Sequence, residues 1–147
     1  MDQTLTLPDG RRVGFSDFGT PGHVPVLWCH GGPGSRLDAA AAGQAGQSLG
    51  LRIIGIDRPG YGLSSPNPGR SIGGWITDGL AVADRLGLDQ FLVAGSSTGG
   101  AYALALAAKA PDRVLGVVAG CAMTDMRYPP ARASMPGPAT QGVWGAP

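Results

Sequence analysis

Apolar residues along the chain gather in short runs that are separated by turns rich in glycine and proline. A loose alternation of apolar and polar positions on both sides of Pro8-Asp9-Gly10 predicts a β-hairpin. Four further apolar runs have the length of strands and cover residues 24–29, 51–56, 91–94 and 114–122. Runs that are apolar at nearly every position are typical of strands that are buried on both faces of a parallel sheet.

Three segments between these strands have a helical pattern. Residues 35–49 are rich in alanine and end at Gly50, residues 71–86 carry apolar positions three and four apart, and residues 98–110 end before Pro111. The order is a hairpin followed by alternating strands and helices. It predicts an α/β fold with a mostly parallel sheet, an N-terminal β-hairpin and helices on both faces.

The character of the chain changes near its end. Residues 127–147 contain five prolines and three glycines and keep no periodicity. We therefore predict a folded core over residues 1–126 and a proline- and glycine-rich tail over residues 127–147.

Composition excludes several classes of partner. Charged residues make up 14% of the 147 residues, and 11 Lys and Arg against 10 Asp and Glu leave a net charge of +1. No basic field is present that would hold nucleic acid or an anionic membrane. The longest apolar stretches have about ten residues, whereas a membrane helix needs about 20. The N-terminus lacks the pattern of a signal peptide, so we expect a cytoplasmic protein without nucleic-acid or membrane partners.

The two cysteines, Cys29 and Cys121, lie in apolar runs and have no CxxC partner. This pattern indicates small buried residues rather than zinc or redox chemistry. We expect neither a metal nor a cofactor.

The candidate chemistry lies in three glycine-rich loops, each of which directly follows a predicted strand. They cover residues 30–34 (HGGPG), 57–62 (DRPGYG) and 95–100 (GSSTGG). Ligands of open parallel sheets bind beyond the carboxyl ends of the strands. If the sheet is parallel, all three loops meet at one edge.

The third loop fits a nucleophile elbow, Gly-x-Ser-x-Gly between a strand and a helix. Ser97 has Gly95 and Gly99 at the required offsets, whereas Ser96 has Ala94 and Thr98 there, so Ser97 is the predicted nucleophile. No lysine follows as in a Walker loop, and the Gly-x-Gly-x-x-Gly fingerprint of dinucleotide sites is absent from this loop.

The first loop is suited to stabilising an oxyanion. The backbone N–H of Gly32 and that of Thr98, the residue after the nucleophile, are the predicted donors. His30 precedes this loop, and we expect it to orient the loop rather than to act as a base. Asp57 and Arg58 are expected to be structural, through hydrogen bonds to neighbouring loops and to each other.

Together these motifs resemble the α/β-hydrolase fold superfamily over about residues 3–123, in the family's order and at its spacing. The resemblance implies a serine hydrolase that acts on an ester or similar small acyl compound. The 30–34 loop is similar to that of proline-iminopeptidase-like hydrolases, but the 57–62 loop and the elbow differ, so peptidase specificity does not carry over. Serine at position 97 argues against epoxide hydrolases and haloalkane dehalogenases, which use aspartate there.

The family's chain order is nucleophile, acid and then histidine, yet both histidines, His23 and His30, precede Ser97. A catalytic histidine base is therefore absent, and Asp125 is the candidate acid. The resemblance implies the N-terminal half of a longer hydrolase, with the tail as the start of a lid. The 114–122 strand would then be an open apolar edge, through which the chain could self-associate.

Two other functions remain open: a catalytically inactive remnant of a hydrolase that binds small molecules or nothing, and a dinucleotide-binding domain. Ester turnover would separate the first from an enzyme, and titration with NAD would reveal the second.

Overall fold

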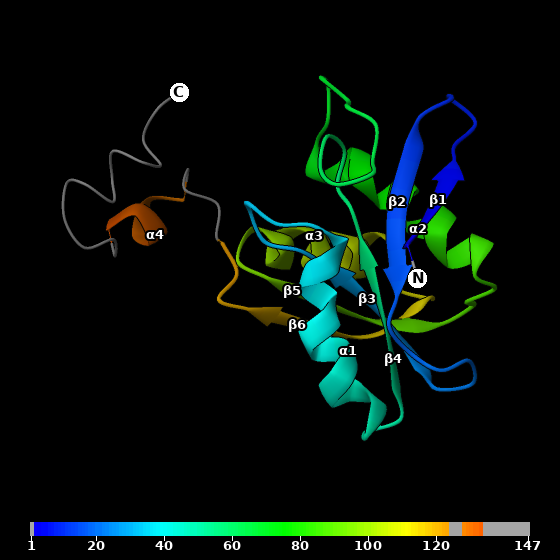
Figure 1. The fold of residues 1–147 in the computed structure, drawn as a ribbon. Coiled ribbons are helices and arrows are strands. Elements are labelled where there is room, and N and C mark those ends of the chain that lie inside the picture. Colours follow the sequence, from blue (N-terminus) through cyan, green and yellow to red (C-terminus); the bar gives the residue numbers. More distant parts are fainter. Residues whose placement is uncertain (1, 124–127, 134–147) are drawn as a thin grey trace.

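A computed structural model of the chain describes residues 2–123 and 128–133 (Figure 1). It confirms the α/β fold, with a mixed, mostly parallel sheet and an N-terminal hairpin. The strands are β1 (Asp2–Thr6), β2 (Arg12–Asp17), β3 (Val24–Cys29), β4 (Leu51–Ile56), β5 (Phe91–Ser96) and β6 (Val114–Gly120). The helices are α1 (Ala39–Gln47), α2 (Ile72–Arg85), α3 (Thr98–Lys109) and α4 (Pro129–Ala133), and a 3-10 turn, η1 (Arg36–Asp38), precedes α1.

The strands form one sheet in the order β1-β2-β4-β3-β5-β6. The hairpin β1–β2 is antiparallel and joins β4 antiparallel, whereas β4, β3, β5 and β6 are parallel to one another. Leu27 in β3 lies beside Ile54 of β4 and Val93 of β5, which fixes the register at the centre. The carboxyl ends of four strands therefore meet at one edge of the sheet.

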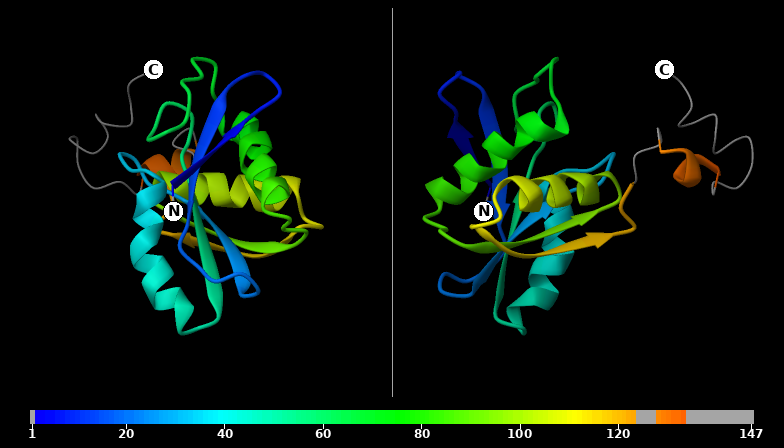
Figure 2. Two further views of the ribbon diagram at one scale, coloured as in Figure 1. Left: turned by 45° about the vertical axis from the view of Figure 1, so that its right-hand side comes forward. Right: turned by 180° about the vertical axis from the view of Figure 1, so that it is seen from behind.

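Helices cover both faces of the sheet, as predicted. α1 lies on one face, and α2 and α3 lie on the other (Figures 1 and 2). Because side chains alternate along a strand, neighbouring residues of β3 enter different cores. Leu27 and Cys29 pack in the cluster that contains Trp75 of α2, whereas Val26 packs in the cluster that contains Ala39 of α1.

The ends of α1 and α2 have capping and terminating residues that are typical of helix ends. Ser71 caps α2 by accepting a hydrogen bond from the Gly74 N–H at 3.0 Å. Gly50 and Gly87, which follow α1 and α2, both have positive φ, a conformation that glycine adopts without a steric cost. None of the helices among the described residues is long and apolar enough to cross a membrane.

β6 is exposed, so the burial that its apolar run predicts is wrong, whereas the predicted open edge of the sheet is present in the described residues. Leu115 is 57% exposed and Val118 67% exposed. β6 is an edge strand, paired with β5 on one side, and α1 packs on β4 rather than on β6. The apolar sequence of β6 is typical of a strand that pairs with a neighbour on each side. Among the described residues, β6 pairs with β5 alone.

The prediction that both cysteines are buried is half wrong. Cys29 is fully buried in β3, and burial raises the pKa of its thiol to about 12. Cys121 is exposed, because β6 ends at Gly120 and Cys121 turns away from the strand with a φ of 48°. Both are free thiols, and β5 lies between β3, which contains Cys29, and β6, which ends one residue before Cys121.

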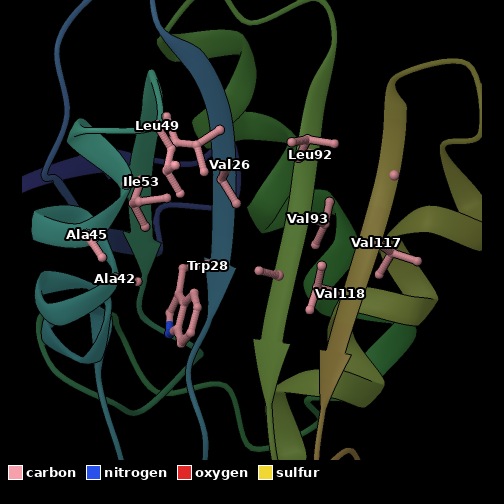
Figure 3. Close-up of a pocket in the computed structure, with 14 residues that line it drawn as sticks. Val26, Trp28, Ala42, Ala45, Leu49, Ile53, Leu92, Val93, Val117 and Val118 are labelled. Carbon is pink, nitrogen blue, oxygen red and sulfur yellow. The ribbon is translucent and has the colours of Figure 1, made fainter.

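An apolar groove of about 490 Å³ lies on the α1 face of the sheet. Ala45 of α1 and Leu49, which follows the helix, line one side, and Val117 and Val118 of β6 line the other, with Trp28 between them (Figure 3). The groove is the part of this face that α1 leaves uncovered. The predicted site residues Ser97, Gly32 and Thr98 do not line it.

Candidate active site

The three glycine-rich loops meet at the carboxyl edge of the parallel strands, as the sequence predicts. The first follows β3, the second β4 and the third joins β5 to α3. Arg58 of the second loop donates hydrogen bonds to Gly31 of the first and Thr98 of the third. The site is therefore built from segments that are far apart in the sequence, since Arg58 lies 27 residues from Gly31 and 40 from Thr98.

Ser97 occupies the sharp turn between β5 and α3. Its φ of 53° and ψ of −124° are unusual for a residue with a side chain, whereas Ser96 is the last residue of a regular strand. The Ser97 side chain does not cap α3 and is only partly buried. Backbone strain of this kind is concentrated at functional sites. The geometry supports the choice of Ser97 over Ser96.

The glycines on either side of Ser97 are required by close backbone approach. A Cβ at Gly95 would collide with the carbonyl of Gly99, and a Cβ at Gly99 would collide with the carbonyl of Cys29. The absence of both side chains lets the start of α3 lie against the ends of β5 and β3. This packing brings the first N–H groups of α3, which have no partner within the helix, to the edge where Ser97 lies.

The Gly31–Gly32 segment lies beside the elbow. A Cβ placed on Gly31 would be 3.6 Å from Cβ of Ser97, and one placed on Gly32 would be 3.2 Å from Oγ1 of Thr98. The structure thus brings together Gly32, Ser97 and Thr98, the three residues that the sequence predicts for attack and for oxyanion binding.

His30 is fully buried and is held through both ring nitrogens. Its Nδ1 lies 2.7 Å from the Gly31 carbonyl oxygen, and its Nε2 accepts the Arg58 backbone N–H at 3.1 Å. A carbonyl can only accept, so these contacts assign the neutral tautomer with hydrogen on Nδ1. Burial lowers the pKa of His30 below its usual value, which favours the same neutral form. His30 orients the loop, as expected.

Arg58 joins the loops more closely than the sequence indicates. Its Nη2 donates to the Gly31 carbonyl at 2.6 Å, and its Nη1 donates to Thr98 Oγ1 at 3.2 Å. The guanidinium lies 4.9 Å from the ring centre of Tyr61 and 4.8 Å from that of Tyr102. Tyr102 contacts Arg58 from α3. In the sequence, only its helical spacing with apolar residues of the same helix suggests that it faces the interior.

Asp57 serves the architecture of the second loop. The carboxylate is fully buried and accepts the Arg36 N–H at 2.6 Å, the Arg36 guanidinium at 3.1 Å and the Leu63 N–H at 2.8 Å. The predicted bonds to neighbouring loops are present, but the partner of Asp57 is Arg36 and not Arg58. Nothing in the local sequence around Arg36 indicates a buried ion pair, so its pairing with Asp57 was not predicted.

The described part of the chain places neither the candidate acid nor a histidine base beside Ser97. Asp125 lies outside them. His23 precedes β3 and so lies at the opposite, amino edge of the sheet. Among residues 2–123 and 128–133, no three histidine, cysteine, aspartate or glutamate side chains gather in a way that could hold a metal ion.

A strained serine between a strand and a helix, facing a glycine loop from a neighbouring parallel strand, is the arrangement of an α/β hydrolase. Residues 24–141 match the family model of the alpha/beta hydrolase fold, and the chain belongs to this family.

Individual relatives share this part of the fold. The chain is 37% identical over 115 residues to a 2-hydroxymuconate semialdehyde hydrolase from Pseudomonas putida, covering 76% of this chain and 40% of the relative. It is 32% identical over 117 residues to a proline iminopeptidase from Neisseria gonorrhoeae, covering 78% and 37%. A solved thermophilic esterase from Thermogutta terrifontis matches with a TM-score of 0.72 and 29% identity over 84% of this chain and 46% of the esterase. The chain spans about two fifths of the length of these two curated relatives.

Proposed function

We propose that the protein is a serine hydrolase that cleaves an ester or a similar acyl compound through Ser97. The observation that carries the proposal is the positive φ of Ser97 at the β5–α3 turn, beside the Gly31–Gly32 loop. The names of the relatives, a semialdehyde hydrolase, an iminopeptidase and an esterase, support hydrolysis as the reaction type.

In the proposed reaction, Ser97 Oγ forms a bond to the acyl carbon, and the carbonyl oxygen becomes an oxyanion. The Gly32 and Thr98 N–H groups donate to that oxygen. The bond to the leaving alcohol then breaks, the alcohol takes the proton that Ser97 gave up, and water releases the acyl group from Ser97.

The proton of Ser97 needs a base, and the described histidines do not supply one. The ring nitrogens of His30 contact Gly31 and Arg58, and His23 lies at the other edge of the sheet. We assign the base to a histidine in the additional length that the relatives have, and Asp125 remains the proposed acid. A cytoplasmic location also remains a proposal.

The position of the histidines supports a second candidate, a hydrolase-like domain without catalysis. The two functions differ in the reactivity of Ser97. A fluorophosphonate probe forms a Ser–O–P bond and releases fluoride, and free imidazole can accept the proton in place of the missing base. The 147-residue chain alone should not turn over p-nitrophenyl acetate, but with imidazole its Ser97 should be phosphonylated, as read by mass spectrometry.

Two variants make this test specific. Ser97→Ala should abolish the modification, whereas Ser96→Ala, one residue away at the end of β5, should keep it. Equal modification of the Ser97→Ala variant, or an unmodified wild-type chain in the presence of imidazole, would favour the domain without catalysis.

A further inference from the structure

We propose that Arg58 is a positioning residue that aims both N–H donors of the oxyanion site, those of Gly32 and Thr98. The inference rests on the proposed function and extends it to a residue that the sequence assigned to the architecture of the loop. The guanidinium of Arg58 donates a hydrogen bond to the loop of each donor, to Gly31 in the first and to Thr98 in the second.

The first contact orients the Gly31–Gly32 peptide. The Gly31 carbonyl oxygen accepts hydrogen bonds from Arg58 Nη2 at 2.6 Å and from His30 Nδ1 at 2.7 Å. A trans peptide is planar, with its C=O and N–H pointing in opposite directions. Fixing the Gly31 oxygen on the Arg58 side therefore turns the Gly32 N–H away from Arg58. Without Arg58 the oxygen would keep only the hydrogen bond from His30 Nδ1, and the peptide could rotate more freely between its two glycines, which restrict it little.

The second contact holds the elbow. Arg58 Nη1 donates to Oγ1 of Thr98 at 3.2 Å, and Thr98 is the first residue of α3. The guanidinium is a rigid planar fork. Because Nη1 and Nη2 belong to that one fork, the distance between the Gly31 loop and the elbow is set by a group that cannot bend.

Arg58 is itself held in place. Only 5% of it is exposed, its guanidinium contacts the rings of Tyr61 and Tyr102, and its backbone N–H donates to His30. In the described part of the chain, the ion pairs of the carboxylates do not include Arg58. A buried positive charge that has no carboxylate partner within residues 2–123, and that lies beside both donors, favours the negative charge that develops on the substrate oxygen.

A purely structural arginine would look similar, and the chain offers a matched control. Arg113 donates to the carbonyls of Leu88 at 2.7 Å and Asp89 at 3.2 Å, and it lies 5.5 Å from the ring centre of Phe91. It likewise joins two backbone carbonyls and an aromatic ring, at the amino edge of β5 and β6, and it also pairs with Asp84 at 2.7 Å. Loss of Arg113 should affect stability without affecting Ser97.

The experiment compares Arg58→Lys, Arg58→Met and Arg113→Met in the 147-residue chain. The first readout is the rate of phosphonylation of Ser97 with imidazole present, measured at several probe concentrations. The second is the position of the Gly32 and Thr98 amide signals in ¹⁵N NMR spectra. Lysine keeps the charge but cannot donate as a two-armed fork, so Arg58→Lys separates positioning from charge.

We expect the saturating rate of phosphonylation to fall about 100-fold for Arg58→Met and at least about tenfold for Arg58→Lys, because small displacements of catalytic groups have effects of this size. The probe concentration that gives half of the saturating rate should change little. The Gly32 and Thr98 signals should shift in both Arg58 variants and stay in place in Arg113→Met. If Arg58→Met does not fold, Arg58→Lys decides.

A wild-type rate in Arg58→Lys would overturn the inference. An unreactive wild-type chain would instead count against the proposed function. In that case the amide signals still test Arg58: shifts in Arg58→Lys support positioning, and unmoved signals refute it.

Discussion

The imidazole of His30 donates a hydrogen bond from one ring nitrogen and accepts one at the other. The Gly31 carbonyl accepts from Nδ1, while the Arg58 backbone N–H donates to Nε2. A second proton on Nε2 would place that N–H against the N–H of Arg58. Burial is the main cause of the lowered pKa of His30, and the positive charge of Arg58 works in the same direction.

This environment predicts a loss of stability in mild acid. The unfolded chain has the ordinary histidine pKa of about 6.5, and the pKa of His30 in the folded state is lower. Between these values the unfolded state binds the proton and the folded state does not. The free energy of unfolding should therefore fall as the pH drops below about 6.5, by at most about 1.4 kcal/mol per pH unit. Urea unfolding between pH 5 and 8 measures this slope.

The matched variants are His30→Gln and His23→Gln. The first should remove the His30 contribution to the slope, and the second should keep it. Asp2 and Asp9 have lowered pKa values, below 3.8, so their protonation falls outside this range. A slope that survives in His30→Gln and disappears in His23→Gln would contradict the assignment.

Contact between α3 and the ends of two strands gives the elbow its shape. Gly95 and Gly99 lie where backbone meets backbone, and α3 also packs against β6. The position of α3 therefore depends more on its close packing against the sheet than on its helix propensity.

We expect Gly99→Ala to separate α3 from β3, because the new Cβ would collide with the Cys29 carbonyl. Backbone cannot move aside as a flexible side chain can, so the free energy of unfolding should fall by about 1–3 kcal/mol. Phosphonylation of Ser97 should fall with it, since the elbow would shift. Thermal unfolding and the labelling assay measure the two effects.

Gly73→Ala in α2 is the control, because nothing lies within 4 Å of a Cβ at Gly73. Alanine is the better helix former there, and the variant should be more stable by up to about 1 kcal/mol. If Gly99→Ala were as stable as Gly73→Ala, the close approach of α3 would not constrain the elbow.

The two faces of the molecule differ in how well they are covered. α2 and α3 pack over one face, while on the other α1 leaves the apolar groove between itself and β6 open. In the described part of the chain, β6 is the last strand of the sheet, and its outer edge pairs with no other strand. Exposed apolar edges of this kind promote association, and we propose that the isolated chain is marginally stable and self-associates through this face.

Val118→Lys tests this proposal at the wall of the groove. Val118 is 67% exposed, so lysine there has little cost for the single chain, but its charge would have to be buried between two chains. Sedimentation over a range of concentrations should show association of the wild-type chain and a shift of Val118→Lys towards monomer.

Leu104→Lys serves as the comparison, since Leu104 is 47% exposed on α3, outside the groove. It removes exposed apolar surface elsewhere and should leave association unchanged. Equal behaviour of the two lysine variants would argue for general surface hydrophobicity, and a monomeric wild-type chain would exclude association through this face.

Much of this architecture could be predicted from local patterns. The strand over residues 24–29, the turn at Gly50, the cap at Ser71 and the serine between Gly95 and Gly99 all depend on neighbours within a few residues. The same holds for the meeting of three loops at one edge, because parallel strands require it once their order along the chain is known.

Tertiary structure alone decided the features that depend on distant partners. The apolar run of β6 predicts burial, yet its exposure depends on what pairs with β5 and what covers the sheet. The role of Arg58 arises because loops after β3, β4 and β5 meet around one guanidinium, and the ion pair of Asp57 with Arg36 joins residues 21 apart. Local sequence determines backbone conformation and which faces are apolar, whereas such contacts are set by strand order and register, which no short stretch of sequence contains.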